Sequence, residues 1–469
     1  MKVLLIYPLP RLARKPGPKW LPLGLSFIAS SLEREGHQVK IFDRLTAAAS
    51  VGPKREIINH MMMKELRNFK PDLVGFSTVS PLIYDTVSSA EIIRAEHNCT
   101  IVAGGHHATA LPQLTLQKIP ALDGVIQGEG ELVLPRLASG EDPLSIPGVW
   151  WKDDSSIQGS PPSQIADLDS LPFPNLSLLD LDYYGRPGRG TIRGHHLSSL
   201  SLVTSRGCLY NCDFCAERLT YGKGLRQHSP DYVLEWINSI LANYKTEAFY
   251  IHDNDFLSNR ERAEMICEKI IDSGLNRKIK FAIQTSVNRI DHEIAALLKK
   301  AGCVLVEMGL EAAEQRLLDS VNKKATVQMN ERAVKVCHKA GLPVHAYMMQ
   351  GFAGETLNDL ENRMRWLKRA GKSVTVTMPM LQLYPGTKIY REKGGRFFEK
   401  EPWTEGVISE YYRTDHLTAI SPEGRLTWHQ KKFTPLMRRR NRLALLANTP
   451  LPRFISLVLQ KLKRKMLSS

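Results

Sequence analysis

The sequence predicts an α/β protein in which a doubly wound parallel sheet, resembling a Rossmann fold, is followed by a partial (β/α)6 barrel and a helical, basic C-terminal segment. Two observations lead to this fold class. Apolar runs of strand length alternate with amphipathic runs of helix length over residues 1–140, and the alternation resumes as six units within residues 196–395. Parallel strands need helical crossovers, so this alternation indicates parallel sheets covered by helices. Residues 141–195 are rich in Pro, Gly, Ser and Asp and are typical of a linker, and residues 396–469 depart from the repeat.

Five strands are expected in the N-terminal unit, and they are separated by helical stretches such as 25–35, 56–68 and 84–96. The strands are Lys2–Tyr7, Gln38–Asp43, Asp72–Ser77, Thr100–Ala103 and Gly124–Gln127. Ligands of such sheets bind at the carboxyl ends of the strands. That rule singles out three loops, which are Ser77-Thr78-Val79-Ser80, Gly104-Gly105-His106-His107 and Gly128-Glu129-Gly130-Glu131. A dinucleotide site is disfavoured, because Tyr7-Pro8-Leu9-Pro10 replaces the glycine-rich turn.

Six strands are expected in the second unit, and several of the helices between them end at glycine. The strands are Leu200–Ser205, Ala248–His252, Lys280–Thr285, Cys303–Gly309, Val344–Met349 and Val374–Met378. Six units fit a partial parallel barrel with its site at the carboxyl ends of the strands.

Three cysteines follow the first barrel strand in a C-x3-C-x2-C pattern, at Cys208, Cys212 and Cys215. Three thiolates on one loop can hold three corners of a cubane iron–sulfur cluster and leave the fourth iron open. An open position on a metal indicates catalysis rather than structure. A zinc finger with His228 would need a second histidine that residues 229–240 lack, and a redox C-x-x-C pair would leave Cys208 without a role.

The cysteine loop resembles that of the radical S-adenosylmethionine (SAM) superfamily, including the aromatic Phe214 before the last cysteine. The resemblance implies that the open iron chelates SAM and that one electron, from an external flavodoxin- or ferredoxin-type donor, cleaves it to a 5′-deoxyadenosyl radical. The three N-terminal loops resemble the cobalamin-binding domain that precedes many such barrels. Expected cofactors are therefore a [4Fe–4S] cluster, SAM and cobalamin.

The resemblance also implies which residues contact the cofactors. For cobalamin, the expected contacts are Ser77, Thr78, Gly104, Gly105, Gly128 and Glu129. For SAM, they are Asp253 at the amino group, Glu311 at the ribose, Tyr384 beside the adenine, and Gln284 and Gly351 at strand ends. Each could instead be a turn residue or a helix cap, as for Asp253 and Asp255 before a helix.

The cobalamin resemblance has one departure. The Asp-x-His-x-x-Gly motif that supplies an axial histidine elsewhere is absent, so His106 and His107 are expected to line the loop and cobalt to carry no histidine. The alternative is a degenerate domain that serves only as a scaffold.

Similar proteins most often methylate an unactivated carbon, and we expect this reaction on a small-molecule or lipid-like intermediate. Radical cyclisation or ring rearrangement of porphyrin or hopanoid type is the alternative, since the motifs are shared. A cobalamin sensor without turnover is disfavoured by the intact cysteine loop.

The net charge of +15 is concentrated at the C-terminus, where residues 424–469 hold twelve Lys or Arg and no Asp or Glu, so the rest is near +3. A nucleic-acid partner is therefore not expected, because its site would need a basic groove with interleaved aromatics. No apolar run approaches the roughly 18 residues that span a membrane, and a cytoplasmic protein is expected. The tail places Ile455, Val458, Leu459 and Leu462 on one helical face, which favours either contact with an anionic membrane surface or a docked terminal helix.

Overall fold

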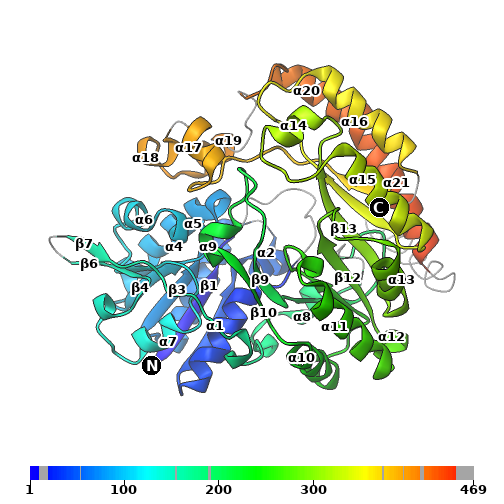
Figure 1. The fold of residues 1–469 in the computed structure, drawn as a ribbon. Coiled ribbons are helices and arrows are strands. Elements are labelled where there is room, and N and C mark those ends of the chain that lie inside the picture. The colour runs from blue at the N-terminus through cyan, green and yellow to red at the C-terminus, as the bar shows by residue number, and fades with distance from the viewer. Residues whose placement is uncertain are drawn as a thin grey trace, which may run out of the picture.

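Two α/β units lie side by side and are followed by a helical C-terminal region (Figure 1). The computed structural model describes residues 1–9, 20–52, 54–153, 156–187, 192–371, 374–394, 396–411 and 417–449. The basic tail from residue 450 onwards, on which the membrane prediction rests, lies outside the described residues.

The first unit is a seven-stranded sheet with the order β2-β1-β3-β4-β5-β6-β7. Its parallel strands are β1 (Lys2–Tyr7), β2 (Gln38–Asp43), β3 (Leu73–Ser77), β4 (Thr100–Gly104) and β5 (Gly124–Ile126). The order 2-1-3-4-5 reverses direction between β1 and β3, and ligands of doubly wound sheets bind at such a switch point. The doubly wound sheet expected from the sequence is confirmed.

Helices cover both faces of this sheet because apolar side chains alternate along its strands. Val3 and Leu5 pack with α1 (Leu23–Arg34) and α7 (Val133–Ala138), whereas Leu4 and Ile6 pack on the opposite face. That face carries α3 (Arg55–Phe69), α4 (Ile83–Glu96), α5 (His106–Ala110) and α6 (Pro112–Lys118), and α2 (Arg44–Val51) follows β2.

The segment expected to be a linker contributes to the first sheet. β6 (Val149–Lys152) pairs antiparallel with β5, and β7 (Ile157–Gly159) pairs with β6 at the edge. The sheet therefore continues past residue 140, and the domain boundaries drawn from the sequence stay a prediction. Beyond it, the chain runs through α8 (Leu181–Tyr184) toward the second unit.

The second unit is a six-stranded parallel sheet with the order β15-β14-β13-β12-β11-β8, which is the expected partial barrel. Its strands are β8 (Ser199–Leu202), β11 (Ala248–Ile251), β12 (Lys280–Thr285), β13 (Cys303–Glu311), β14 (Val344–Met348) and β15 (Val374–Thr377). The helices between them are α10 (Pro230–Asn243), α11 (Arg260–Asp272), α12 (Leu275–Lys278), α13 (His292–Lys300), α14 (Gln315–Asp319), α15 (Val327–Lys339) and α16 (Leu357–Arg369). The long helices begin where a polar side chain accepts a hydrogen bond from the first turn, at Ser229, Asn259, Asp291, Thr326 and Thr356.

A short hairpin carries the cysteine loop, where the sequence predicted one strand over residues 200–205. β8 ends at Leu202, and a separate β9 (Ser205–Cys208) pairs antiparallel with β10 (Gly224–Gln227). The loop between them contains the other two cysteines of the motif and α9 (Glu217–Tyr221).

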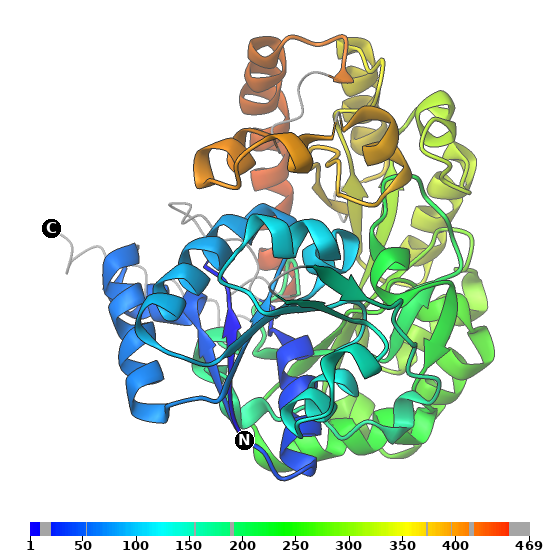
Figure 2. The same ribbon diagram turned by 90° about the vertical axis from the view of Figure 1, so that its left-hand side faces the viewer.

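The region after the barrel packs on both units. α17 (Lys388–Lys393), α18 (Phe397–Lys400) and α19 (Glu405–Tyr411) lie over the first unit, as Figure 2 shows, and Phe398, Trp403 and Ile408 join its core. α20 (Pro422–Trp428), the π-helical turn His429–Phe433 and α21 (Thr434–Asn448) return to the barrel. Within the described ranges, no helix has the length and apolarity needed to cross a bilayer.

Candidate active site

A cavity of about 430 Å³ lies at the carboxyl ends of the first sheet and opens toward the barrel. From the first unit it is lined by Tyr7, Trp20, Ser77, Thr78, Gly104, Gly105, His106, Gly128 and Glu129. From the second unit it is lined by Val203, Arg206, Thr220, Tyr221 and His252. Both units therefore share one cavity at the switch point of the first sheet, which is where the fold predicts a ligand.

The floor of this cavity is shaped by missing side chains. It continues as an apolar slot between the sheet and helices α1 and α7, lined by Leu5, Leu25, Ile28, Val102 and Leu134. Gly75 lies in the middle of β3 beside the slot, where a Cβ would come within 3.0 Å of the Leu5 side chain. An open mouth with polar loops above an apolar slot suits a large ring that carries a tail, and a corrinoid with its nucleotide is such a molecule.

Thr78 and Gly105 hold the loop of residues 77–80 against the loop of residues 104–107. Thr78 is fully buried, and its hydroxyl donates to Gly104 O (2.7 Å) and accepts from Ala108 N (3.1 Å). Gly105 has φ +92°, and a Cβ there would lie 2.7 Å from Thr78 O. Ser77 and Gly104 are left half-buried at the cavity wall. The loop residues thus divide into those that build the cavity and those that face it.

The two adjacent histidines point in different directions. His106 is exposed and lines the cavity, with Nδ1 3.3 Å from Thr220 Oγ1. His107 is fully buried against Phe398 and Trp403, and burial lowers its pKa to about 3. Its Nδ1 contacts Ser80 Oγ at 2.9 Å. His107 is therefore a neutral core residue and does not face the cavity.

Glu129 also lines the cavity, but its carboxylate is already bound. One oxygen accepts from Arg206 and the other from Arg226 and from the backbone of Ile165. Both arginines lie on the β9–β10 hairpin. The side chain that the sequence assigned to cobalamin thus connects the two units.

The three thiols Cys208, Cys212 and Cys215 lie close enough to influence one another's ionisation. Burial raises the pKa of each, and burial together with the nearby Glu217 and the other two thiols raises the pKa of Cys215 to about 12. Deprotonation of these buried thiols costs free energy. Binding of cationic iron would offset that cost, because iron binds the thiolate form. In the described part of the chain, no three such side chains converge on a single metal ion. A cubane does not need that convergence, because each thiolate binds a different iron.

Segments of the barrel and of the region after it hold the cysteine loop in place. Asp213 N donates to Val321 O, Ile389 N donates to Asp213 O, and Lys388 pairs with the Asp213 carboxylate at 2.8 Å. Asn322 donates to Asn211 O at 2.8 Å. The loop after β15 packs on α9, where a Cβ at Gly386 would lie 2.7 Å from the Leu219 side chain.

The zinc alternative finds no support in the position of His228. Its ring is buried, lies 3.0 Å from Asp169 through Nδ1 and stacks on Tyr232 with 4.0 Å between ring centroids. Burial lowers its pKa to about 4.

Asp253, the expected partner of the SAM amino group, has its carboxylate in an internal network. Its oxygens accept from Thr204 N and Thr204 Oγ1 (both 2.6 Å) and from Ser205 N (3.0 Å), and the residue is fully buried. Asp255 is likewise bound by Thr285 and Ser286. Neither carboxylate caps a helix. Asn254, which lies between them, is half-buried and donates to Glu217 (3.0 Å) at the start of α9, two residues after Cys215. Of the three residues at this strand end, Asn254 is therefore the one that faces the cysteine loop.

Glu311 ends β13 in a left-handed conformation with φ +58°, which is rare and strained for a residue with a Cβ. Its carboxylate pairs with Lys323 at 2.9 Å. Burial lowers the pKa of Lys323, but Glu311 and Cys212 raise it more, so the net shift is upward. The structure therefore brings Glu311 to the cysteine loop, together with a cation that the sequence analysis missed because Lys323 follows no strand.

Gln284 belongs to a polar network inside the barrel that sequence reasoning also missed. It donates to Tyr250 OH (2.8 Å), which donates to the fully buried Glu307 (2.7 Å). Tyr347 also donates to Glu307, and Arg193 pairs with it at 2.6 Å. The inward-facing alternation of strand residues could have indicated this layer.

The two remaining predicted positions form the rim of the barrel. Gly351 has φ +97°, and its N–H donates to the buried Glu355 (2.6 Å), which pairs with Arg363. Glu355 is thus a structural acceptor for the loop that contains Gly351. Tyr384 is half-buried and donates to Gln382 (2.6 Å) in the loop beside α9. Both positions lie at the carboxyl ends of the barrel strands, as the sequence predicted.

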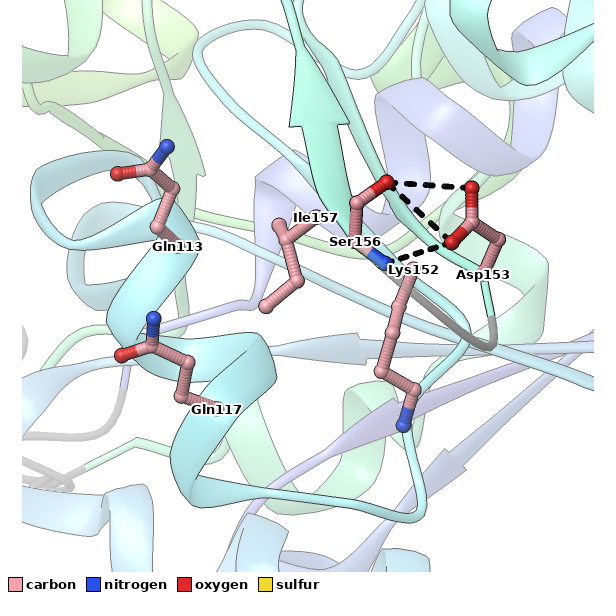
Figure 3. Close-up of a pocket in the computed structure, with 6 residues that line it drawn as sticks. All are labelled: Gln113, Gln117, Lys152, Asp153, Ser156 and Ile157. Atoms are coloured by element: carbon pink, nitrogen blue, oxygen red, sulfur yellow. Dashed lines mark hydrogen bonds between the residues drawn. The ribbon is translucent and has the colours of Figure 1, made fainter.

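A separate hollow of about 370 Å³ lies on the outer side of the first unit, between α6 and the β6–β7 hairpin (Figure 3). Gln113, Gln117 and Ile157 line it together with Lys152, Asp153 and Ser156, and Ser156 bonds to Asp153. None of the predicted site residues lines it. The shared cavity, which several of them line, is therefore the candidate active site.

The fold and the site together define an enzyme in which a three-cysteine barrel faces the ligand cavity of a doubly wound domain. Comparison with family models agrees. Residues 202–367 match the radical SAM superfamily, and residues 11–138 match the B12 binding domain.

The chain is similar to a methyltransferase and a cyclase over most of its length. The uncharacterized methyltransferase PH0819 of Pyrococcus horikoshii is 31% identical over 83% of this chain and 82% of its own. The anaerobic magnesium-protoporphyrin IX monomethyl ester cyclase of Cereibacter sphaeroides is 27% identical over 74% of this chain and 56% of its own. The solved structure of the radical SAM methyltransferase TsrM from Kitasatospora setae, with cobalamin and a [4Fe–4S] cluster bound, superposes with a TM-score of 0.66. It is 20% identical and covers 84% of this chain and 75% of TsrM.

The chain belongs to the cobalamin-binding radical SAM enzymes. Its cofactors are accordingly a [4Fe–4S] cluster, SAM and cobalamin. The three thiols, the open strand ends around them and the glycine-shaped cavity fit these groups.

Proposed function

We propose that the protein transfers a methyl group to an unactivated carbon of a small-molecule or lipid-like biosynthetic intermediate. The observation that carries this proposal is the single cavity lined by both units, with Ser77 and Gly104 on one side and Val203 and His252 on the other. A corrinoid seated over the first sheet would face the barrel opening without an intervening wall.

The bound cofactors supply a hydrogen-abstracting radical and a transferable methyl group, and the chain supplies their arrangement. Cys208, Cys212 and Cys215 would hold the cluster, Asn254 and the Glu311–Lys323 pair border the same loop, and Trp20 and His252 stand at the opening between the units. Trp20 packs edge-on against His252 with 5.6 Å between ring centroids. The substrate would lie at this opening, which α17–α19 do not enter.

The test is product analysis after anaerobic reconstitution with SAM that carries an isotopic label in its methyl group. Methyl transfer predicts labelled product, S-adenosylhomocysteine and 5′-deoxyadenosine in comparable amounts. The candidate substrates are small molecules and lipids extracted from the organism that produces the enzyme. A product that lacks the label would exclude methyl transfer.

The second candidate is a radical cyclase, favoured by the similarity to the magnesium-protoporphyrin ester cyclase. A cyclase would form 5′-deoxyadenosine with substrate but no S-adenosylhomocysteine. The same product analysis therefore separates the two reactions.

We further propose that cobalt carries no protein histidine. The buried position of His107 and the absence of the axial motif support this proposal. Electron paramagnetic resonance (EPR) of the Co(II) form would detect nitrogen hyperfine splitting from a protein histidine, and observing that splitting would overturn the assignment.

An external flavodoxin- or ferredoxin-type protein is proposed as the electron donor, and an anionic membrane as a peripheral contact. On α21, Arg438, Arg439 and Arg442 are exposed beside Leu443 and Leu446, which supports the second proposal. Each such cation adds about 1 kcal/mol near an anionic surface. We expect sedimentation with anionic but not neutral vesicles, lost on deletion of residues 450–469; equal sedimentation of the truncated chain would exclude the tail as anchor.

A further inference from the structure

The Gly-Glu-Gly-Glu turn of residues 128–131 places two carboxylates against the barrel. Gly128 has φ +82°, and a Cβ there would lie 2.9 Å from Pro162, while a Cβ at Gly130 would lie 3.0 Å from the Ile28 side chain. The glycines therefore let the turn pass between these neighbours. Glu129 and Glu131, which alternate with them, are both buried.

The partners of these carboxylates are two arginines on the hairpin that carries the cysteine loop. Arg206 donates to Glu129 (2.5 Å) through one nitrogen and to Glu131 (2.7 Å) through the other, and Arg226 donates to Glu129 (2.7 Å). The side chains of Arg206, Glu129 and Glu131 are 5%, 3% and 7% exposed, so these pairs are not screened by solvent.

The hairpin alone is electrostatically unfavourable. Arg206 and Arg226 are direct partners across β9 and β10, and like charges in that position repel. The two glutamates of the other unit neutralise the two arginines, so the charges of the buried Arg206, Glu129 and Glu131 and of the half-buried Arg226 sum to zero. The positive charges of the hairpin are therefore complementary to the carboxylates of this turn, whereas within the hairpin they repel each other.

We propose that the Gly-Glu-Gly-Glu turn is a clamp. Its two carboxylates bind the hairpin and thereby position the cysteine loop over the cavity that the two units share. Arg206 lies two residues before Cys208, and Gly224 at the start of β10 is the register partner of Cys208. The turn also lines the cavity. The clamp thus connects the first cluster ligand to the cavity wall through two side chains, and Glu129 and Glu131 are positioning residues rather than cofactor ligands.

A charge-balanced mutant cycle tests the clamp. Glu131→Gln leaves one excess positive charge, Arg206→Gln leaves one excess negative charge, and the double variant leaves the neutral Glu129–Arg226 pair. Two quantities are measured. One is amide hydrogen exchange of β9 and β10 in cofactor-free protein, and the other is the Co(II)–cluster distance distribution by pulsed EPR in reconstituted protein.

We expect each single variant to speed exchange of the hairpin by at least about tenfold and to widen the distance distribution. The double variant should be less disturbed than the two single effects combined. Glu141→Gln is the matched control, because it removes the partner of the exposed Arg136 in the same unit and should change neither quantity.

Unchanged exchange and distance in Glu131→Gln, or a double variant as disturbed as the sum, would overturn the clamp. If Glu131→Gln does not fold, Glu131→Asp replaces it. That variant keeps the charge but shortens the side chain by one methylene group. Unchanged exchange and distance in that variant, or an additive double variant, would likewise overturn the clamp.

Discussion

The two units differ in the residues that occupy the carboxyl ends of their parallel strands. In the first unit, the loops face the cavity largely with backbone and glycine, and their polar side chains bind each other, as Thr78 binds Gly104. In the barrel, the predicted strand-end carboxylates Asp253 and Asp255 are held by neighbouring donors, and so is Glu355 after β14. A strand end therefore fixes where a residue lies, but its free hydrogen-bonding capacity depends on partners from other elements.

The largest effect should distinguish the three cysteines of the cysteine loop from the other cysteines of the chain. Cys212→Ala should reduce 5′-deoxyadenosine formation to the background of cluster-free protein, because one iron loses its ligand. Cys99→Ala and Cys303→Ala, at buried positions of the two cores, are the controls and should retain SAM cleavage. Normal cleavage by Cys212→Ala would end the cluster assignment.

The next effect distinguishes a structural carboxylate from a site residue. Asp253→Asn should lower the free energy of unfolding by about 3 kcal/mol, because the donors from Thr204 and Ser205 lose one of the two buried carboxyl oxygens that accept from them. SAM affinity of the folded fraction should stay within about threefold of the wild type. Asn254→Ala is the matched neighbour and should do the reverse, weakening SAM binding with little loss of stability. Denaturant titration and equilibrium SAM binding measure the two quantities.

A smaller effect tests how the first unit builds its cavity. Gly105→Ala combines a positive φ with a Cβ 2.7 Å from Thr78 O, so we expect about 2–3 kcal/mol of destabilisation and reduced corrinoid uptake. Gly140→Ala has a similar φ of +86° but open space around its Cβ, and should cost only about 1 kcal/mol. Equal effects of the two variants would show that close packing against Thr78 is unimportant.

The smallest effect concerns pH. Because burial holds the pKa of His107 near 3, the unfolded chain binds a proton as pH falls below about 6.5 while the folded chain does not. Stability should therefore fall with decreasing pH, and this one site should contribute about 2 kcal/mol between pH 7.5 and 5. His107→Gln should show a correspondingly weaker pH dependence of the unfolding midpoint, compared with its own value at pH 8. An unchanged dependence would contradict the neutral, buried state.

Periodicity predicted most of the strands and helices because each buries an apolar face locally. β6 and β7 were missed, since Val149–Lys152 and Ile157–Gly159 are short and lie among turn residues. The separate β9–β10 hairpin was missed because Gly207 and Gly224 are residues that normally break strands. The cysteines were found from spacing alone, since their ligand role depends on one loop.

Side-chain direction was the part that the sequence could not supply. Glu129 lines the expected cavity, yet its acceptors are occupied by Arg206, which is 77 residues away. Asp253 and Asn254 are adjacent, and only their tertiary partners decide which of them faces the cysteine loop. Such choices depend on pairs of residues distant in the chain, and a single sequence does not reveal those pairs.

The contacts that fix the cysteine loop also set an order for maturation of the enzyme. Asp213 is held by Val321, Lys388 and Ile389, and Lys388 follows it by 175 residues. At ribosomal rates of about 5–20 residues per second, that interval lasts about 10–35 s. During this time, the nascent chain exposes three thiols on a loop without its final supports. Cluster insertion is therefore expected to follow completion of the barrel, and a chain truncated before residue 384 should be synthesised with its cysteines but acquire no stable cluster.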